Sequence, residues 1–265
     1  MGVLNLTSDS FYDGGRHVLL ESALAHARRM ADDGADLIDV GGESTRPGAE
    51  PVDEQQELDR VIPVIERLRE QVSCLISIDT MKPAVMREAC AAGARLINDV
   101  NALRAPGAME AVRDAGAAAC LMHMQNEPRT MQLAPSYVDV LADVTDYLLA
   151  RAHDCVDHGI ARESLLLDPG FGFGKRLEHN LALLAGLPAL GALGFPLLVG
   201  LSRKAMLGQL CDGAAVDQRL AASVAAATAA VLGGAAIVRV HDVRETRDAV
   251  RVATAIRRAR EGRTG

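Results

Sequence analysis

The sequence predicts a closed (β/α)8 barrel, the TIM barrel of α/β proteins, as a single domain over residues 1–265. Eight short apolar runs are each followed by a helical segment. This alternation is typical of a parallel sheet joined by crossover helices. The length suits one barrel, which commonly has about 250 residues. No linker or shift of composition indicates a second domain. A doubly wound open sheet is the alternative.

The first four strands are predicted from apolar runs, each followed by a segment with helical periodicity. The strands are residues 1–6, 37–40, 74–79 and 95–100. The helices are residues 20–33, 58–68, 83–92 and 106–115. Pro83 suits the first turn of a helix, and Gly34, Gly93 and Gly116 each end one. Pro63, inside the second helix, should kink that helix or mark a fresh start.

The last four units follow the same pattern. The strands are residues 120–124, 165–168, 196–201 and 237–240. The helices are residues 137–158, 178–193, two pieces within 203–232, and 243–259. The loop DPGFGFGKR is not a phosphate-binding loop, because Pro169 and Arg176 replace the Gly and Ser or Thr of a Walker sequence. We interpret it as a loop that approaches a ligand closely, with Phe171 or Phe173 covering a flat ring.

Composition argues against several classes of function. The formal net charge of −7 and the pI of about 5.5 argue against nucleic acid or an acidic membrane as a partner. The five cysteines form no CxxC pair, so we expect reduced thiols in a cytoplasmic protein. No signal peptide is recognised, and no apolar run reaches the ~20 residues of a membrane span. No Gly-x-Ser-x-Gly, HExxH or zinc-type spacing occurs.

Every predicted strand ends in polar residues. They are Asn5; Glu43, Ser44, Thr45 and Arg46; Asp79; Asn98 and Asp99; His123; Asp168; Ser202, Arg203 and Lys204; Arg239 and His241. The carboxyl ends of the strands of such a barrel form one mouth, where active sites lie. The polar ends therefore predict a single site at this mouth.

The polar ends divide into two chemical sets. Asp79, Asn98 and Asp168 suit a planar heterocycle that bears amino and ring N–H donors and a carbonyl. The second set consists of cations and N–H donors, which suit a phosphate or diphosphate. Its members are Arg46, Arg203, Lys204, Arg239 and His241. Asn5 offers a neutral oxygen, which Mg²⁺ accepts when phosphate and water supply the other ligands.

Single positions also have structural interpretations. Asp79 could cap the helix that follows it. Asp99 is interpreted as a turn residue. His123 is interpreted as a residue of the core, or one that supports the site without contacting the ligand.

Several segments resemble the bacterial dihydropteroate synthase family. They are MGVLNLTSDSF, IDVGGESTRPGA, SIDT, IND, LMHMQ, LDPGFGFGK, GLSRK and RVHDV. They occur in order, at barrel spacing, over nearly the whole chain. The resemblance implies condensation of 6-hydroxymethyl-7,8-dihydropterin diphosphate with p-aminobenzoate, a step of folate synthesis that sulfonamides inhibit. Ser8 and Ala205 replace the family's usual Pro and Ser, and the family usually has a segment upstream of the first strand.

The resemblance also implies roles for individual residues. It implies pterin binding by Asp79, Asn98, Asp168, Lys204, Met122 and Phe173. It implies p-aminobenzoate binding by Phe11, Thr45, Arg46, Pro47, Phe173 and Ser202. It implies diphosphate binding by Asn5, Arg46, Arg239 and His241, with Mg²⁺ on Asn5. It implies catalytic roles for Lys204, Arg239, His241 and Arg46.

The implied chemistry is an SN1-like departure of diphosphate, assisted by Mg²⁺. Two alternatives remain open from the sequence. A pterin-binding methyltransferase that moves a methyl group to a corrinoid would use the same barrel but need no diphosphate site. An inactive pterin-binding scaffold is the other alternative. The family commonly forms homodimers, so we expect a homodimer.

Overall fold

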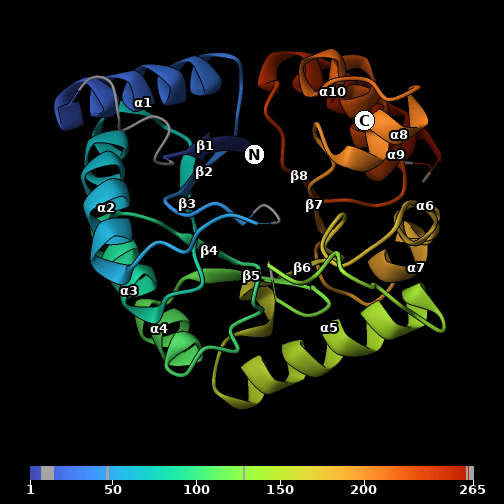
Figure 1. The fold of residues 1–265 in the computed structure, drawn as a ribbon, viewed down its shortest axis with the longest axis horizontal. Helices are drawn as coiled ribbons and strands as arrows, with labels where there is room; N and C mark the ends of the chain where they lie inside the picture. Colours follow the sequence, from blue (N-terminus) through green and yellow to red (C-terminus); the bar gives the residue numbers. More distant parts are fainter. Residues whose placement is uncertain (7–14, 46–47, 128, 261, 263–265) are drawn as a thin grey trace.

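Short strands lie inside a ring of helices in the computed structural model, which describes residues 1–6, 15–45, 48–127, 129–260 and 262 (Figure 1). The strands are β1 (Gly2–Asn5), β2 (Leu37–Gly41), β3 (Leu75–Asp79), β4 (Leu96–Asp99), β5 (Ala118–Met122), β6 (Leu165–Asp168), β7 (Leu198–Val199) and β8 (Ile237–Val238). The helices are α1 (Gly15–Asp32), α2 (Glu54–Gln71), α3 (Pro83–Ala92), α4 (Ala108–Ala115), α5 (Val140–Asp157), α6 (Leu177–Ala185), α7 (Leu187–Gly191), α8 (Ala205–Leu210), α9 (Leu220–Leu232) and α10 (Val243–Arg260). The predicted order of strands and helices is therefore correct.

The strands pair in sequence order and all in parallel. β1 to β6 form one sheet, and β7 pairs with β8 in a second. A single parallel bridge joins the sheets at each seam, Gly2 to Val240 and Leu167 to Leu197. The Val3 N–H donates to the Val240 carbonyl at 3.1 Å. The eight strands therefore follow one another around a ring, with ladders interrupted at two seams. β7 and β8 are shorter than predicted.

Alternate residues of the strands divide an inner face from an outer one. Ile38 and Val40 of β2 point outward and belong to the large core under the helices. A separate apolar cluster fills the interior at the amino ends of the strands. It contains Met1, Leu96, Cys120 and Leu198, with Leu37, Ala118, Leu166 and Ile237 partly buried against them. Polar residues follow along the same inner face, so the barrel is closed at its base and polar towards its mouth.

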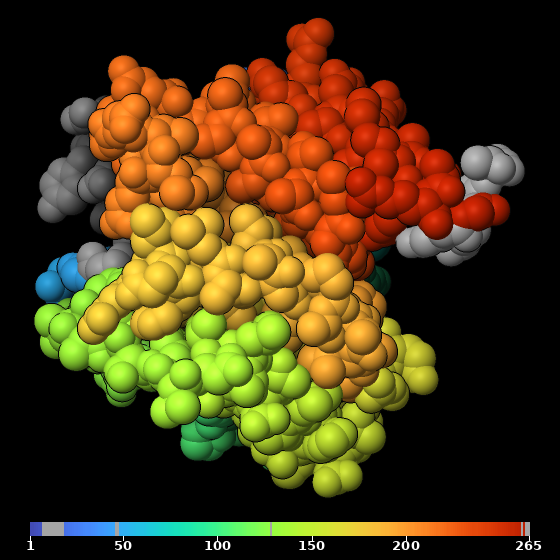
Figure 2. Space-filling model, turned by 90° about the vertical axis from the view of Figure 1, so that its right-hand side faces the viewer, coloured from blue at the N-terminus to red at the C-terminus, as the bar shows by residue number. Residues whose placement is uncertain are grey.

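On the face shown in Figure 2, the orange and red C-terminal third lies above the yellow sixth unit and green α5. No helix in the described ranges is long and apolar enough to cross a membrane. The five cysteines are free, as predicted. The expectation of a single domain stays a prediction.

The fresh start predicted at Pro63 is wrong. α2 runs through Pro63, whose side chain is exposed. The buried face of the helix continues on both sides, with Val61, Val64 and Ile65. Packing of this face therefore outweighs the hydrogen bond that the proline removes. In the sixth unit, the predicted 178–193 helix divides at Gly186 into α6 and α7.

Asp99 is the turn residue that the sequence suggests. Its carboxylate is fully buried and accepts the N–H groups of Asn101 at 2.7 Å and Leu103 at 2.8 Å. Ala102 and Leu103 have positive φ angles of 52° and 56°, so this turn needs such support. Burial raises the pKa of Asp99 to about 6, although these two hydrogen bonds act in the opposite direction.

We predict that Asp99→Ala lowers the free energy of unfolding by at least about 2 kcal/mol, because each buried group left unsatisfied costs about 1–3 kcal/mol. Asp139→Ala is the matched control. Asp139 also accepts two backbone N–H groups, from Leu141 and Ala142, but is exposed. Its loss should cost about 1 kcal/mol, as for an N-cap. Urea unfolding measures both, and equal losses would contradict the buried role of Asp99.

Candidate active site

A half-buried arginine lies between two carboxylates inside the barrel mouth. Arg239, next to β8, donates from Nε to Asp39 Oδ2 at 2.6 Å and from Nη2 to Asp79 Oδ2 at 2.7 Å. Asp39 is in the middle of β2 and fully buried, and Asp79 ends β3. Burial raises the pKa of Asp79 to about 7, although Arg239 counteracts it. Asp79 therefore does not cap the following helix, whose N-cap is Lys82.

Asn98 and Asp168 lie in the same polar layer. Asn98, on β4, is buried and donates from Nδ2 to Asp39 Oδ2 at 3.0 Å. Asp168 ends β6 and accepts the Gly170 N–H on Oδ1 at 2.7 Å. Burial raises the pKa of Asp168, while Lys204 is the main influence that lowers it. The three residues predicted to bind a heterocycle, Asp79, Asn98 and Asp168, therefore lie in one polar layer, which forms the floor of the mouth.

The loop after β6 is shaped by side chains that bind its carbonyl groups. Lys175 Nζ donates to the Gly170 and Phe173 oxygens at 3.0 and 3.1 Å. Lys204 Nζ donates to the Phe171 oxygen. The Gly172 and Gly174 oxygens accept from Gln132 Nε2 and Tyr137 Oη. Five successive carbonyls are thus each bound by a side chain.

Glycine is required at position 170 of this loop. Gly170 has a φ of 68°, and a Cβ atom there would lie 1.8 Å from the His123 carbonyl oxygen. No side chain fits in that space. The loop therefore approaches the end of β5 more closely than a side chain at this position would allow. The predicted close approach of the loop to a ligand stays a prediction.

Lys175 and His123 form a buried pair beneath this loop. Lys175 Nζ lies 2.8 Å from His123 Nδ1, and Lys175 is only 3% exposed. Burial, and then Lys175, lower the pKa of His123 to about 3, so its neutral ring accepts a hydrogen bond from the lysine. Burial lowers the pKa of Lys175 to about 7. His123 thus supports the site from behind, which matches its structural interpretation.

Lys204 and Phe173 face each other at the mouth. Lys204 Nζ is 4.7 Å from the centre of the Phe173 ring. Burial lowers the pKa of Lys204 to about 8, against the influence of Asp168. Phe173 packs in one apolar cluster with Met122, Val100 and other residues. The predicted apolar walls, Met122 and Phe173, therefore lie together beside the polar floor.

Ser202 and His241, which follow strands β7 and β8, are also in contact. The His241 backbone N–H donates to Ser202 Oγ at 3.2 Å, and His241 Nδ1 lies 3.0 Å from the same oxygen. Arg203, by contrast, is bound to Asp242 by two hydrogen bonds, one of 3.0 Å from Nε. Arg203 is therefore held by Asp242, whereas Arg239 is held by Asp39 and Asp79.

Glu43 holds the base of the loop after β2 through two hydrogen bonds. One carboxylate oxygen of Glu43 accepts the Val52 N–H at 3.1 Å, and the other accepts Lys82 Nζ at 2.6 Å. Lys82 also binds Glu57, which is fully buried on α2. Thr45 is partly buried in this loop. Phe11, Arg46 and Pro47, three predicted ligands of p-aminobenzoate, lie outside the described residues.

Sequence reasoning missed two central residues, Asp39 and Lys175. Asp39 interrupts the apolar run LIDVG, and its position two residues from Leu37 and from Gly41 puts all three on the inner face. That period-2 signal was available. Lys175 carried no such signal, because its role depends on how the loop folds back over it.

The oxygens of Asn5 and Asp79 could hold a magnesium ion only if a substrate phosphate and water supplied its other ligands. No group of three His, Cys, Asp or Glu side chains suited to a metal occurs in the part of the chain described here. A Cβ atom built on Gly41 would lie 3.6 Å from Asn5 Oδ1 and 3.8 Å from Asp79 Oδ2, so glycine leaves room between these oxygens. Mg²⁺ commonly takes one or two protein oxygens, with phosphate and water completing its shell. These residues fit that pattern.

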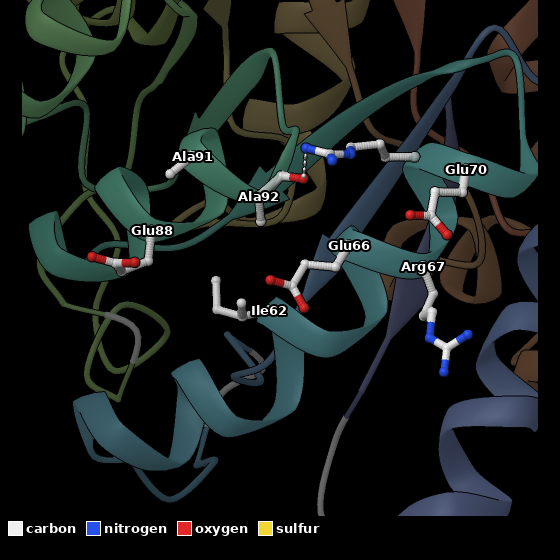
Figure 3. Close-up of a pocket in the computed structure, with 8 residues that line it drawn as sticks. Ile62, Glu66, Arg67, Glu70, Glu88, Ala91 and Ala92 are labelled. Atoms are coloured by element: carbon white, nitrogen blue, oxygen red, sulfur yellow. Dashed lines mark hydrogen bonds between the residues drawn. The ribbon is translucent and has the colours of Figure 1, made fainter.

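A groove of about 520 Å³ lies elsewhere, between α2 and α3. Its lining is mostly charged, with Glu66, Arg67 and Glu88 among its residues (Figure 3). Arg69 donates to the Ala92 carbonyl across it at 3.5 Å. It belongs to the outer ring of helices and shares no residue with the barrel mouth.

Comparisons with known proteins agree with one another. Residues 1–241 match the family described as pterin binding enzyme. The chain is 52% identical to the dihydropteroate synthase of Escherichia coli (strain K12), over 99% of this chain and 93% of the relative. It resembles a Yersinia pestis dihydropteroate synthase with a sulfonamide drug, at TM-score 0.92 and 52% identity, covering 97% and 93% of the chains. It also resembles a Xanthomonas albilineans dihydropteroate synthase in complex with 7,8-dihydropteroate, at TM-score 0.87 and 50% identity, covering 97% and 92%. These similarities confirm the predicted barrel class.

We predict that Lys175→Met loosens the loop after β6, because the Gly170 and Phe173 carbonyls lose their donor. Hydrogen exchange at the amides of Gly170, Gly172 and Phe173 should speed up by about tenfold or more, the equivalent of one lost hydrogen bond. Arg176→Met is the control, since this neighbouring side chain is exposed. Exchange as slow as in the wild type would show that Lys175 does not hold the loop.

Proposed function

The chain belongs to the dihydropteroate synthases of the pterin-binding enzyme family, and from that premise we propose how its barrel mouth carries out the reaction. The enzyme joins 6-hydroxymethyl-7,8-dihydropterin diphosphate to p-aminobenzoate and forms 7,8-dihydropteroate and diphosphate. The observation that carries our proposal is the floor of acceptors made by Asp79, Asn98 and Asp168, the last two of them buried. Lys204 lies close enough to this floor to lower the pKa of Asp168 against the effect of burial.

The pterin ring would bind on this floor. Asp79 and Asp168 would accept hydrogen bonds from its amino and ring N–H groups, and Lys204 would donate to its carbonyl. Met122 and Phe173 would enclose the flat ring, since they belong to one apolar cluster beside the floor. Carboxylates in a buried site also stabilise positive charge that develops on the ring. An SN1-like path is therefore our proposal.

The diphosphate would leave towards the rim. His241, Asn5 and Arg46 are the proposed ligands, with Arg239 behind them. Arg239 uses Nε and Nη2 for Asp39 and Asp79, and no described residue binds its Nη1. Nη1 would therefore be available to the oxygen that takes the electron pair when the carbon–oxygen bond breaks. The neutral aniline nitrogen then attacks the pterin methylene carbon with its lone pair, so no protein base is needed for the attack. The proton that the nitrogen loses afterwards passes to the departed diphosphate.

Mg²⁺ is proposed as the metal of the reaction, held by Asn5. When bound, it would neutralise the negative charge that gathers on the diphosphate. Asn5 would orient the leaving group, and the gap at Gly41 would admit the substrate oxygens near Asp79.

p-Aminobenzoate would bind between the loops that follow strands β2 and β7. Thr45 and Ser202 are the described residues proposed there, and Phe11, Arg46 and Pro47 are proposed from the family resemblance. The Lys82–Glu43 ion pair supports this placement, because it holds the base of the loop that carries Thr45. Sulfonamides, which imitate p-aminobenzoate in shape and charge, are proposed to bind at the same place.

A homodimer and a cytoplasmic location are also proposals. α9 consists almost entirely of Ala, Val and Leu, and α10 exposes Val252 and Ile256. This apolar surface supports a dimer of the kind common in the family. The five free cysteines suit a reducing compartment.

We predict that mixing the chain with the pterin diphosphate, p-aminobenzoate and Mg²⁺ releases diphosphate in amounts equal to the dihydropteroate formed. Release should depend on p-aminobenzoate and stop with a chelator. A coupled diphosphate assay with chromatography of the product measures both. Diphosphate release that does not depend on p-aminobenzoate would contradict the synthase mechanism proposed for this mouth.

The pH dependence should follow Asp79 and Lys204. Asp79 accepts from the pterin when ionised, so kcat/KM for the pterin diphosphate should rise with pH through about 7. Lys204 donates when protonated, so kcat/KM should fall above about pH 8. Asp79→Asn should remove the acid limb and cost about 1.5–3 kcal/mol of transition-state stabilisation. Lys204→Met should remove the alkaline limb instead. A profile that keeps both limbs in both variants would rule out these assignments.

A further inference from the structure

Asp39 is a buried carboxylate with no role in the proposed reaction. It stands in the middle of β2, is fully buried, and lies below the residues proposed to contact the pterin. A lone buried charge is costly, so a charge in this place needs partners that hold it. Its partners indicate what it does.

Both hydrogen bonds of Asp39 are made by one oxygen. Oδ2 accepts from Arg239 Nε at 2.6 Å and from Asn98 Nδ2 at 3.0 Å. Oδ1 is buried with no hydrogen-bond partner among the described residues. In the ion pair with Arg239, Asp39 presents acceptor oxygens to its neighbours.

This restricts the side-chain amide of Asn98. An asparagine amide can present either its NH₂ group or its oxygen to a neighbour. Only the NH₂ group can face Asp39, since two oxygens would repel each other. The Asn98 Oδ1 atom must therefore point away from Asp39, and Asn98 acts as an acceptor at the floor of the mouth.

We propose that Asp39 is a positioning residue that fixes the Asn98 amide with its oxygen towards the pterin. The inference rests on the proposed function, because it assumes that the pterin lies on this floor. The floor then presents three acceptors in a row, from Asp79, Asn98 and Asp168. It selects a heterocycle edge that carries N–H donors and rejects an edge that carries acceptors.

Ser77 provides a matched control. It is paired with Asp39 across the β2–β3 ladder, and it is also fully buried with an unpartnered side-chain oxygen. It has no hydrogen bond to Asn98 or Arg239 among the described residues. Ser77→Ala therefore disturbs the same layer of the barrel without disturbing the proposed orientation.

The experiment uses 6-hydroxymethyl-7,8-dihydropterin, which lacks the diphosphate, as the calorimetric probe. Asp39→Ala should weaken its binding by about tenfold or more, the value of one hydrogen bond. Asp39→Asn should stay within about threefold of the wild type, because an amide oxygen at the Oδ2 position can still accept both bonds. Ser77→Ala should bind like the wild type. The KM for p-aminobenzoate should not change in any of the three.

A double-variant cycle shows whether the effect passes through Asn98. Asn98→Ala should lose as much pterin affinity as Asp39→Ala, and the double variant should lose no more than Asn98→Ala alone. If Asp39→Ala melts below the assay temperature, Asp39→Ser replaces it, since its shorter side chain does not reach Asn98.

Three results would overturn the inference. They are wild-type affinity in Asp39→Ala, equal losses in Asp39→Ala and Asp39→Asn, or additive losses in the cycle. Equal losses would mean that the charge of Asp39 matters and the amide orientation does not. A wild-type enzyme that does not bind the pterin at all would instead overturn the proposed function, so the two failures are distinguishable.

Discussion

The mouth of this barrel depends on the ion pairs that Arg239 makes with Asp39 and Asp79. Three charged groups share the interior, where isolated charges are costly, and each carboxylate is tolerated because the guanidinium lies between them. Removing one member of a fully buried group of this kind typically costs about 3–5 kcal/mol, because the others are left uncompensated. The partial exposure of Arg239 and Asp79 lowers that cost here. The arrangement also joins β2, β3 and β8, which are distant in sequence, across the inside of the ring. The same contacts that make the site polar therefore hold the strand ends together.

Because side chains alternate along each strand, polar residues of the candidate site and apolar residues of the core lie on opposite faces of the same strands. The inner face begins with an apolar cluster at the base and changes to Asp39, Asn98 and Asp168 one step further along each strand. The outer face stays apolar and packs under the helices. A strand therefore contributes to the core with one set of residues and to the candidate site with the other. The charged groups lie above an apolar plug, so the mouth is the polar end of the barrel.

Local sequence signals predicted most of the fold and part of the site. Apolar runs, Pro83 and the helix-ending glycines fixed the order of the units, because these signals act over a few residues. β7 and β8 are shorter than predicted because ladder pairing depends on the neighbouring strand. Asp79, Asn98 and Asp168 were found because they directly follow apolar runs. The partners of Arg239 were not found, because a contact over 160 or 200 residues leaves no local trace. The same holds for Lys175, whose acceptors are mostly backbone carbonyls.

The loop after β6 has a consequence for how this enzyme could change under selection. Its wall is made of backbone, with five successive carbonyls bound by side chains and no room for a Cβ atom at Gly170. A substitution at Gly170 cannot reshape this surface gradually, because any new side chain there collides with the His123 carbonyl oxygen. An inhibitor that gains its affinity from this wall would therefore leave the enzyme few routes to resistance. Side-chain contacts, in contrast, can be altered one residue at a time.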